Sequence, residues 1–313
     1  MNLFPRLPEG GEPTKIRRRA LAGYLGLAVG DALGATTEFL RPQEISSRYG
    51  LHQDITGGGW LNLKAGRVTD DTEMNLALGK ALVNERDFKV EAVGHSFSEW
   101  MSSKPVDIGS TVRQGLKSFR RDGTTVQEEN EYHGGNGAAM RLYPVVLATL
   151  TRPENFEPWA IAQAHLTHHH HESDAGILMI GALSRAAILL GQAAPLDQMI
   201  LDWTQRYPQF SPKLFKGSYD GYIVNSIRCM LYYFNNTGSF EDCMVKIANA
   251  GGDTDTNAVL AGMIAGPFYG LEGLPSRWLK KLEKTVRGQI ETQVQDLFEI
   301  FNPDLVEPNS PTL

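Results

Sequence analysis

Most of the chain carries apolar residues at three- and four-residue spacing, which is the period of an α-helix. The pattern is clear in TDDTEMNLALGKALVNE, SDAGILMIGALSRAAILLGQ and TNAVLAGMIAGPFYG, and the alternation typical of strands is nearly absent. The main irregular stretch is ITGGGWLNLKAGRV. No repeat of fixed period and no linker interrupts the 313 residues. The sequence therefore predicts an all-α fold, with one compact multi-helix domain over residues 15–302, a flexible segment at 1–14 and a tail at 303–313.

Composition and local patterns exclude several classes of protein. The formal net charge of −6 does not suit a general nucleic-acid binder. Cys229 and Cys243 form no CxxC pair and no disulfide framework, as expected for a chain in the reducing cytoplasm. The apolar run ALAGYLGLAVG, which follows KIRRR, is far shorter than the roughly 20 residues of a membrane-spanning helix. We therefore expect neither a signal peptide nor an integral membrane protein.

Three glycines mark one face of the first predicted helix. Gly26, Gly30 and Gly34 recur every four residues. No strand precedes them and the spacing is not GxGxxG, so a dinucleotide-binding loop is not expected. The spacing instead permits close packing of this helix against another.

Two acidic clusters stand at the starts of two apolar helices. One is Thr69 to Thr72 in VTDDTEM, and the other is Asp253 to Thr256 in GGDTDTN. A single capping residue, worth about 1 kcal/mol, would satisfy the free N–H groups of a helix start, but adjacent carboxylates repel each other. Carboxylate and hydroxyl oxygens are the ligands that Mg²⁺, Mn²⁺ or Ca²⁺ prefer. The residues favour a metal site made by both clusters and leave double helix capping as the alternative.

Five motifs in order give the chain a family resemblance. They are GLAVGDALGATTEF, TDDTEM, PVDIGSTVRQGL, GNGAAMR and GGDTDT, and with them the chain resembles the ADP-ribosylglycohydrolases over roughly residues 17–300. GGGWLNLKAGRVTDDTEMNLALGKAL, EPWAIAQAHLTH, YIVNSI and PSRWLKKL are most similar to the branch that reactivates dinitrogenase reductase. The family implies an all-α domain with a two-metal centre in a cleft.

The resemblance also implies a set of metal ligands. Mn²⁺ is the ion associated with the most similar branch and Mg²⁺ with others. Glu38 would lie near or at the second ion. Carried over by position, the ligands would be Thr69, Asp70, Asp71, Asp253, Asp255 and Thr256.

The implied substrate is a protein arginine that carries ADP-ribose on a guanidinium nitrogen. Asp107, in PVDIGSTVR, is the first candidate for the catalytic carboxylate and Glu38 is its rival, whereas Asp31 is expected to be a structural hydrogen-bond acceptor. GGNGAAMR would either start a helix whose free N–H groups could hold ribose or pyrophosphate or form a glycine-rich turn, and Tyr222 could stack on adenine or line the pocket. The substrate-binding candidates are Gly134, Gly135, Asn136, Gly137, Met140, His168 and Tyr222.

The run LTHHHHESDAG holds four of the eight histidines. The zinc-protease spacing HExxH is absent from it. The family pattern is closer to Thr-His-Asn-His-Pro, so His169 and His171 stand where the Asn and Pro would fall. His168 is carried over as a pocket residue, and residues 169–171 are expected to form a solvated helix edge or a supporting layer behind the pocket.

The function implied is a cytoplasmic hydrolase that removes ADP-ribose from an arginine of dinitrogenase reductase, the nitrogenase iron protein. The resemblance further implies a PII-type signalling protein and an ammonium transporter as partners, the second of which would attach the chain reversibly to the membrane. Two alternatives stay open. One is an ADP-ribosyl hydrolase for another target or linkage, such as serine-linked or free ADP-ribose derivatives. The other is a non-catalytic ADP-ribose-binding module, against which the complete ligand set argues.

Overall fold

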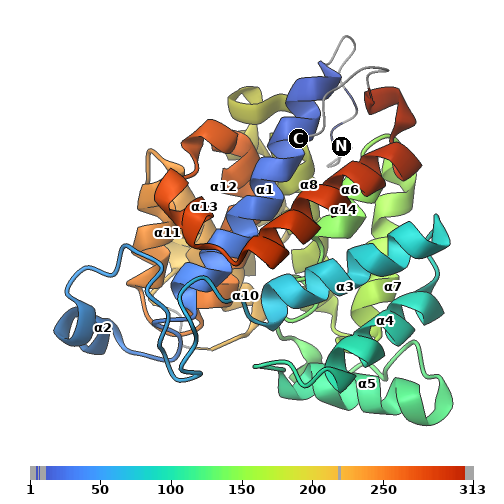
Figure 1. Ribbon diagram of the computed structural model, residues 1–313, viewed down its shortest axis with the longest axis horizontal. Helices are drawn as coiled ribbons and strands as arrows, with labels where there is room; N and C mark the ends of the chain where they lie inside the picture. Colours follow the sequence, from blue (N-terminus) through green and yellow to red (C-terminus); the bar gives the residue numbers. More distant parts are fainter. Residues whose placement is uncertain (1–4, 6, 8–11, 218–219, 307–313) are drawn as a thin grey trace.

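The predicted helical pattern is confirmed in a computed structural model, which describes residues 5, 7, 12–217 and 220–306 (Figure 1). Within these ranges the backbone forms no strand, only two isolated antiparallel bridges. Short 3-10 turns join the helices, among them η1 (Glu131–His133) and η7 (Pro303–Leu305). The α-helices are α1 (Pro13–Gly34), α2 (Pro42–Tyr49), α3 (Asp70–Glu85), α4 (Val90–Ser102), α5 (Ser110–Asp122), α6 (Tyr143–Ala148), α7 (Phe156–His165), α8 (His171–Leu190), α9 (Leu196–Arg206), α10 (Ile223–Asn235), α11 (Phe240–Ala248), α12 (Thr254–Tyr269), α13 (Ser276–Lys281) and α14 (Lys284–Phe301).

Helices α1 and α12 pack against each other along their lengths at the centre of the fold (Figure 1). Helix α12 and the part of α1 after its charged first turns are apolar around most of their circumference, as expected of core helices, and α1 is buried at every position from 20 to 34. A Cβ atom at Gly30 would lie 2.7 Å from the carbonyl oxygen of Ala258, and one at Gly262 would lie 2.6 Å from that of Gly26. The two backbones therefore touch, which confirms the close packing expected of the glycine face.

The contact between α1 and α12 is antiparallel. Gly26 faces Gly262, Gly30 faces Ala258 and Gly34 faces the backbone of residues 254 and 255. The hydroxyl of Thr254 donates a hydrogen bond to the carbonyl of Gly34 at 2.8 Å. The end of α1 is thereby fixed against the start of α12.

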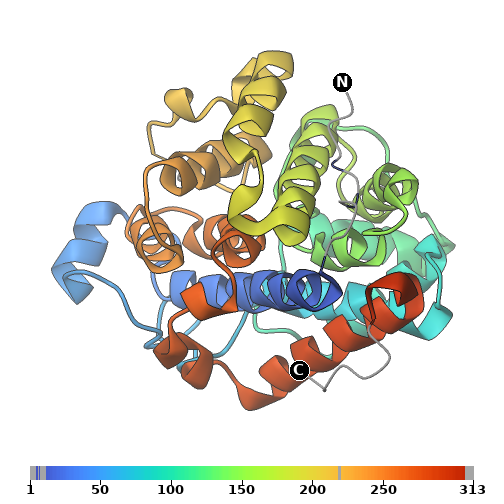
Figure 2. The same cartoon turned by 90° about the horizontal axis from the view of Figure 1, so that it is seen from above.

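Helix α8 is the third central helix, and it packs on both α1 and α12 (Figure 2). The stretch His171–Ala193 is long and apolar enough to cross a membrane by length and composition alone, which the sequence analysis missed. However, 83% of its most apolar window is buried inside the protein. The protein core therefore accounts for the apolar character of this helix.

The remaining helices surround this centre. Helix α14 covers α1 and α3 on one side, and α3, α4 and α5 follow one another along an outer edge (Figure 1). The irregular stretch expected at residues 55–68 lies between α2 and α3, close to the end of α1. Most of segment 1–14 and the end of the tail 303–313 lie outside the described residues, so these boundaries stay predictions. Within the described part, α1 already begins at Pro13 and Leu305 is buried.

We expect Gly30→Ala to lower the free energy of unfolding by about 1–3 kcal/mol, because the added methyl group must force two backbones apart. Gly288 in α14 is the matched control, since a Cβ there would meet nothing within 4 Å. Gly288→Ala should raise the free energy of unfolding by about 0.5–1 kcal/mol. Urea denaturation of both variants measures the difference, and equal stabilities would show that the close contact is not needed.

Candidate metal centre and substrate pocket

Asp31, near the end of α1, holds the start of α3 in place. Its buried carboxylate accepts hydrogen bonds from the backbone N–H groups of Thr69 (3.0 and 3.1 Å) and Thr72 (3.1 Å). It also accepts from the hydroxyls of Thr69 at 3.0 Å and Thr72 at 2.6 Å. Asp31 therefore satisfies the free N–H groups that a capping residue would otherwise satisfy, and its expected structural role is confirmed.

Helix capping does not account for the acidic cluster of α3. The N-cap residues of α3 and α12 are Thr69 and Asp253, and neither side chain makes a capping hydrogen bond. The start of α3 is served from another helix by Asp31. At the start of α12, Asp255 accepts a hydrogen bond from the backbone N–H of Thr256 at 2.9 Å, so this cluster does serve its own helix in part.

The antiparallel packing of α1 and α12 brings the two clusters together. The hydroxyl of Thr256 lies 3.4 Å from Oδ2 of Asp71, which joins one cluster to the other. Glu38 follows the end of α1 and is buried, and its carboxylate lies within 4.8 Å of ligand atoms of Asp253 and Asp255. The pocket lined by these residues has a volume of about 330 Å³.

Burial raises the pKa values of these carboxyl groups. The pKa of Glu38 rises to about 8 and that of Asp70 to about 8, and neighbouring carboxylates add to both increases. Burial also raises the pKa values of Asp71 and Asp255 well above the usual range and raises that of Asp253. Within the described residues, no cationic side chain forms an ion pair with any of them.

These properties fit a divalent cation. Oδ1 of Asp71 is buried without a hydrogen-bond partner, and a buried unpaired acceptor is costly. The donors that surround it are carboxylate and hydroxyl oxygens, which suit a hard ion. The group could therefore hold metal ions whose positive charge replaces the missing counter-charge.

Asp107 lies in the loop before α5 and lines the same pocket. Its Oδ1 accepts a hydrogen bond from the backbone N–H of Ile108 at 2.7 Å. Asp107 is half-buried, and this burial raises its pKa. The repulsion between Asp107 and Asp70, which contributes to the raised pKa of Asp70, agrees with their common position on the pocket.

The glycine segment forms the opposite wall, and it is a glycine-rich turn and not the start of a helix, the other alternative. Residues 134–142 form turns, and α6 begins only at Tyr143. The backbone N–H of Asn136 donates to Gly221, and its side-chain amide donates to Asp253 at 2.6 Å and to Ser226 at 2.9 Å. These long-range bonds, together with the backbone freedom of glycine, favour a turn over a helix.

The other predicted substrate residues lie along this wall. Gly135, Asn136, Gly137, Met140 and His168 line the pocket, whereas Gly134 and Tyr222 lie just beyond that lining and contact each other. His168 is buried, and its Nδ1 lies 2.8 Å from the hydroxyl of Thr167. Burial lowers the pKa of His168 well below its usual range, so the imidazole is neutral at pH 7.

Three residues of this region escaped the sequence analysis. Arg141 is buried and donates to the carbonyl and side chain of Gln163 and to Thr167, each at 2.8 or 2.9 Å, so it supports the segment that carries His168. Phe39 lines the pocket, and Trp60 donates its indole N–H to Glu38 at 2.7 Å. Two of these residues carry a sequence signal that could have found them: Arg141 is the final Arg of GGNGAAMR, and Trp60 follows three glycines.

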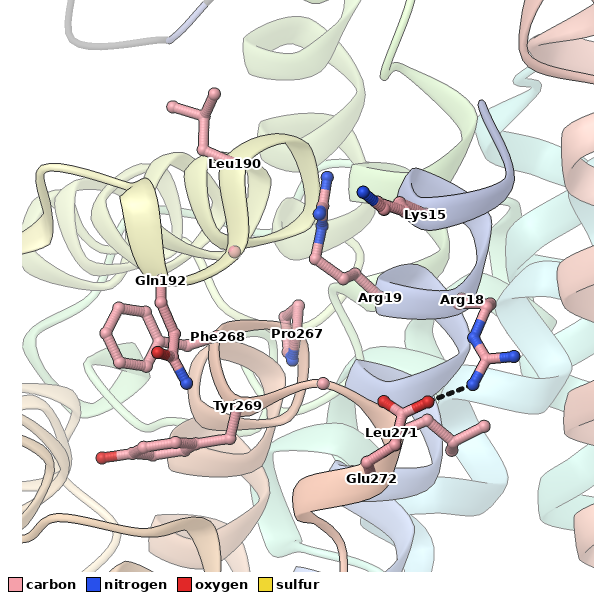
Figure 3. A pocket seen from close by; sticks show the side chains of 12 residues that line it. Lys15, Arg18, Arg19, Leu190, Gln192, Pro267, Phe268, Tyr269, Leu271 and Glu272 are labelled. Carbon is pink, nitrogen blue, oxygen red and sulfur yellow. Dashed lines mark hydrogen bonds and ion pairs between the residues drawn. The ribbon is translucent and has the colours of Figure 1, made fainter. Parts of the chain in front are cut away.

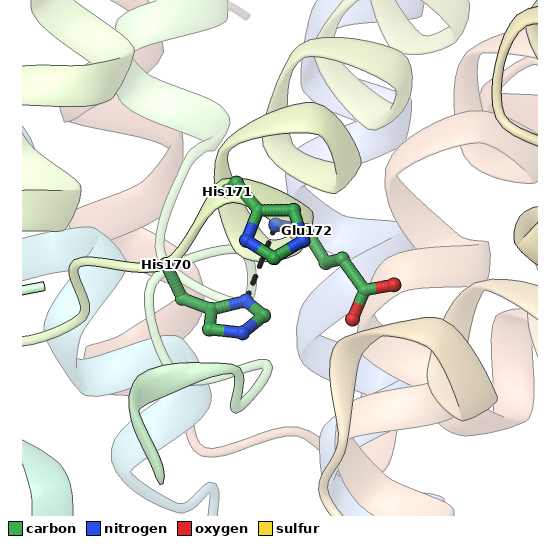
Figure 4. A group of neighbouring side chains, drawn as sticks. All are labelled: His170, His171 and Glu172. Atoms are coloured by element: carbon green, nitrogen blue, oxygen red, sulfur yellow. Dashed lines mark hydrogen bonds between the residues drawn. The ribbon is translucent and has the colours of Figure 1, made fainter. Parts of the chain in front are cut away.

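The side chains of the histidine run lie in different surroundings. His169 bonds to the carbonyl of Gln127 at 2.7 Å. His170 is buried beside Gly134, and its Nδ1 accepts a hydrogen bond from the backbone N–H of Glu172 at 3.2 Å (Figure 4). The side chain of His171 is 74% exposed and stacks on His170. Possible ligand atoms of residues 170–172 also lie within 4.8 Å of one another. The hydrogen bond by which His170 caps α8, the stacking of His171 on His170 and a hydrogen bond from Tyr222 to Glu172 account for this grouping.

A second hollow of about 380 Å³ lies at the other end of α1, between Lys15 and Tyr269 (Figure 3). Its only carboxylate, Glu272, forms an ion pair with Arg18. Arg19 donates hydrogen bonds to the carbonyls of residues 188 and 189 at the end of α8. This hollow therefore offers no ligand set comparable to that of the carboxylate pocket.

Comparisons with known proteins agree with the geometry of the pocket. Residues 12–305 match the family model of the ADP-ribosylglycohydrolases. The chain is 42% identical to ADP-ribosyl-[dinitrogen reductase] glycohydrolase of Rhodospirillum rubrum, over 92% of this chain and 98% of that protein. It is 28% identical to ADP-ribosylarginine hydrolase Tri1 of Pseudomonas putida (strain GB-1), over 92% of this chain and 80% of the other.

A solved structure described as an ADP-ribosylglycohydrolase-related protein complex has the same fold. Its TM-score is 0.81 at 29% identity, and the match covers 92% of this chain and 99% of that chain. The family model spans nearly the whole described chain. The chain therefore belongs to the ADP-ribosylglycohydrolase family and is a hydrolase.

Proposed function

We propose that this chain is a two-metal hydrolase that releases ADP-ribose from an arginine side chain of a target protein, and that the target is dinitrogenase reductase. The observation that carries this proposal is the buried carboxylate cluster, with its unpartnered Asp71 oxygen, at the pocket. Similarity to the R. rubrum protein supports the target, and similarity to the P. putida protein supports the arginine linkage.

In this proposal, residues at the starts of α3 and α12, together with Glu38, would hold two divalent cations. Mn²⁺ is the first choice and Mg²⁺ the second. When bound, the cations would supply positive charge for the two neighbouring ribose hydroxyls. The residues that would hold them are Thr69, Asp70, Asp71, Asp253, Asp255 and Thr256.

The protein itself would orient the substrate and move the proton. Breaking the N-glycosidic bond builds positive charge on the anomeric carbon and the ring oxygen. The Asp107 carboxylate would accept a proton from the attacking water as the water oxygen bonds to the anomeric carbon. The guanidine would leave with the electron pair of the broken C–N bond and would then take up that proton from Asp107. We assign this step to Asp107 and not to Glu38, because Glu38 lies within 4.8 Å of ligand atoms of Asp253 and Asp255 and could itself bind a cation. Asp107 lines the pocket outside that group.

The opposite wall would hold the ADP portion. The absence of side chains at Gly134, Gly135 and Gly137 leaves room for Tyr222 and His168 to pack against this backbone. Gly135, Gly137 and the neutral His168 line the pocket. Tyr222 stands next to this wall with a face for the adenine. A PII-type signalling protein and an ammonium transporter remain proposed partners on the family resemblance alone, and with them a cytoplasmic chain that attaches reversibly to the membrane.

Cation binding is expected to release protons. Cations and protons compete for the same carboxylates, and the pKa values of Glu38 and Asp70 are about 8 without metal. The affinity for Mn²⁺ should therefore rise as the pH rises from 6 toward 8 and level off above that. Calorimetric titration of the chelator-treated chain at pH 7, in two buffers of different ionisation enthalpy, measures the released protons.

Two variants complete that experiment. Asp255→Asn should abolish tight binding at one of the two sites, whereas Asp197→Asn, on the exposed side of α9, should change nothing. The same heat in both buffers together with a pH-independent affinity would contradict the proposed centre.

Asp107→Asn should keep ADP-ribose binding and lose about 10²-fold or more in kcat, because the amide cannot accept the proton of the water. Release of ADP-ribose from modified arginine measures kcat, and calorimetry with ADP-ribose measures binding. Asp122→Asn, at the exposed end of helix α5, which follows Asp107, is the control. A rate within about threefold of the parent, or about 0.7 kcal/mol, would show that Asp107 is not the catalytic carboxylate.

The linkage is tested with two sets of ADP-ribosylated proteins, one modified on arginine and the other on serine. We expect faster release of ADP-ribose from arginine, including arginine of dinitrogenase reductase, as measured by mass spectrometry of the products. Faster release from serine would favour the other linkage. Binding of ADP-ribose without release from either, in the presence of Mn²⁺, would favour a non-catalytic module.

A further inference from the structure

Two large aromatic side chains stand exposed together at the pocket. Phe39 is 60% exposed and Trp60 is 54% exposed, and their ring centroids lie 5.5 Å apart with an interplanar angle of 44°. Phe39 lines the pocket beside the carboxylates. Single exposed apolar residues are ordinary, but a contacting pair at the edge of a polar pocket suits a ligand-binding surface. We call Phe39 and Trp60 the aromatic lip.

The backbone holds Phe39 in an unfavourable conformation. Its φ is +61°, in the left-handed region that bulky side chains rarely adopt. Its N–H donates to the carbonyl of Gly252 at 2.7 Å, and the N–H of Gly252 donates to the carbonyl of Leu40 at 3.0 Å. Backbone strain of this kind persists where the surroundings enforce it, often at binding sites. Phe39 is thus tied to the segment that leads into Asp253.

Trp60 is presented by a tight loop. Gly58 and Leu63 exchange two backbone hydrogen bonds of 2.8 Å that close the loop around Trp60. Gly59 has a φ of +68°, and a Cβ atom there would lie 2.4 Å from the carbonyl oxygen of Ala35. The loop is therefore pressed against the end of α1, and Trp60 has a defined position.

The lip is joined directly to the carboxylate cluster. The indole N–H of Trp60 donates to Oε2 of Glu38 at 2.7 Å. The Glu38 carboxylate in turn lies within 4.8 Å of ligand atoms of Asp253 and Asp255. The opposite wall approaches the same cluster from its own side, through the bond from Asn136 to Asp253. The carboxylates therefore lie between the lip and the glycine wall.

This arrangement separates the two ends of the substrate. If the glycine wall holds the ADP portion and the carboxylates lie at the anomeric carbon, the leaving group faces the lip. A guanidinium group is flat, positively charged and weakly hydrated, and it stacks on aromatic faces. A serine oxygen carries no charge and no flat face, so the same surface would do little for it.

We propose that Phe39 and Trp60 bind the guanidinium of the modified arginine and so determine which linkage the site accepts. This inference rests on the proposed function. The rings hold the leaving group by stacking and by cation–π attraction, and the bond from the indole N–H to Glu38 fixes the position of the Trp60 ring. The aromatic lip is a specificity-determining surface and takes no part in proton transfer.

The test compares arginine- and serine-linked ADP-ribosyl peptides. Trp60→Ala and Phe39→Ala should each raise KM for the arginine-linked peptide by about 3- to 30-fold, the range of one cation–π contact. KM for the serine-linked peptide and the dissociation constant of ADP-ribose should change less than twofold. Tyr132→Ala is the control, because Tyr132 is 80% exposed and lies outside the pocket lining.

Trp60→Phe separates stacking from the bond to Glu38. It keeps an aromatic face but loses the indole N–H, so it should keep most of the preference for arginine that Trp60→Ala loses. Tryptophan fluorescence gives a second readout in the Asp107→Asn background. ADP-ribosyl-arginine should change the emission and ADP-ribose alone should not, and Trp60→Phe should remove the change.

The outcomes distinguish this inference from the proposed function. Suppose that the parent chain cleaves the arginine linkage, but the lip variants raise KM for both peptides equally or for neither. The lip is then not the guanidinium site, although the proposed function stands. If the parent chain prefers the serine linkage, both fail. A selective loss on the arginine-linked peptide, with folding confirmed by an unchanged melting temperature, supports the lip.

Discussion

The backbone contact between α1 and α12 is the constraint on which the rest of the structure depends. Glycines on both helices let the two helix backbones touch, and the antiparallel direction places the end of α1 at the start of α12. Asp31 then reaches the start of α3, and Glu38 reaches Asp253 and Asp255. A wider separation of the two helices would move the acidic clusters apart, so a packing requirement in the core sets the geometry of the pocket.

The buried carboxylates of the pocket, when ionised, lower the stability of the folded chain. Several carboxylates are buried together, and each raises the free energy of its neighbours when ionised. Asp31 differs, because it accepts hydrogen bonds from two threonines that favour its charged form, although burial still raises its pKa to about 6. Four donors thus serve the carboxylate that holds the helices. Asp71 instead keeps one buried oxygen without a hydrogen-bond partner, which a cation could bind.

Features carried by local pattern could be predicted from the sequence. The helices, the glycine face, the pairing of the acidic clusters and the structural role of Asp31 follow from periodicity, spacing or motif. Features set by contacts between distant segments could not. The turn at Gly135 depends on pairing with Tyr222, the burial of His170 depends on Gly134, and Phe39 and Trp60 meet only because the loop at residues 58–63 folds back on the end of α1.

The amide of Asn136 links the two halves of the pocket. It belongs to the glycine wall, yet it holds one oxygen of Asp253 and so orients the other. Any ligand that shifts this wall also shifts a carboxylate of the cluster. By thermodynamic linkage, a nucleotide that changes the affinity for a cation must have its own affinity changed by the cation by the same factor. A nucleotide bound at this wall and a cation bound at the carboxylates would therefore be coupled through the side chain of Asn136.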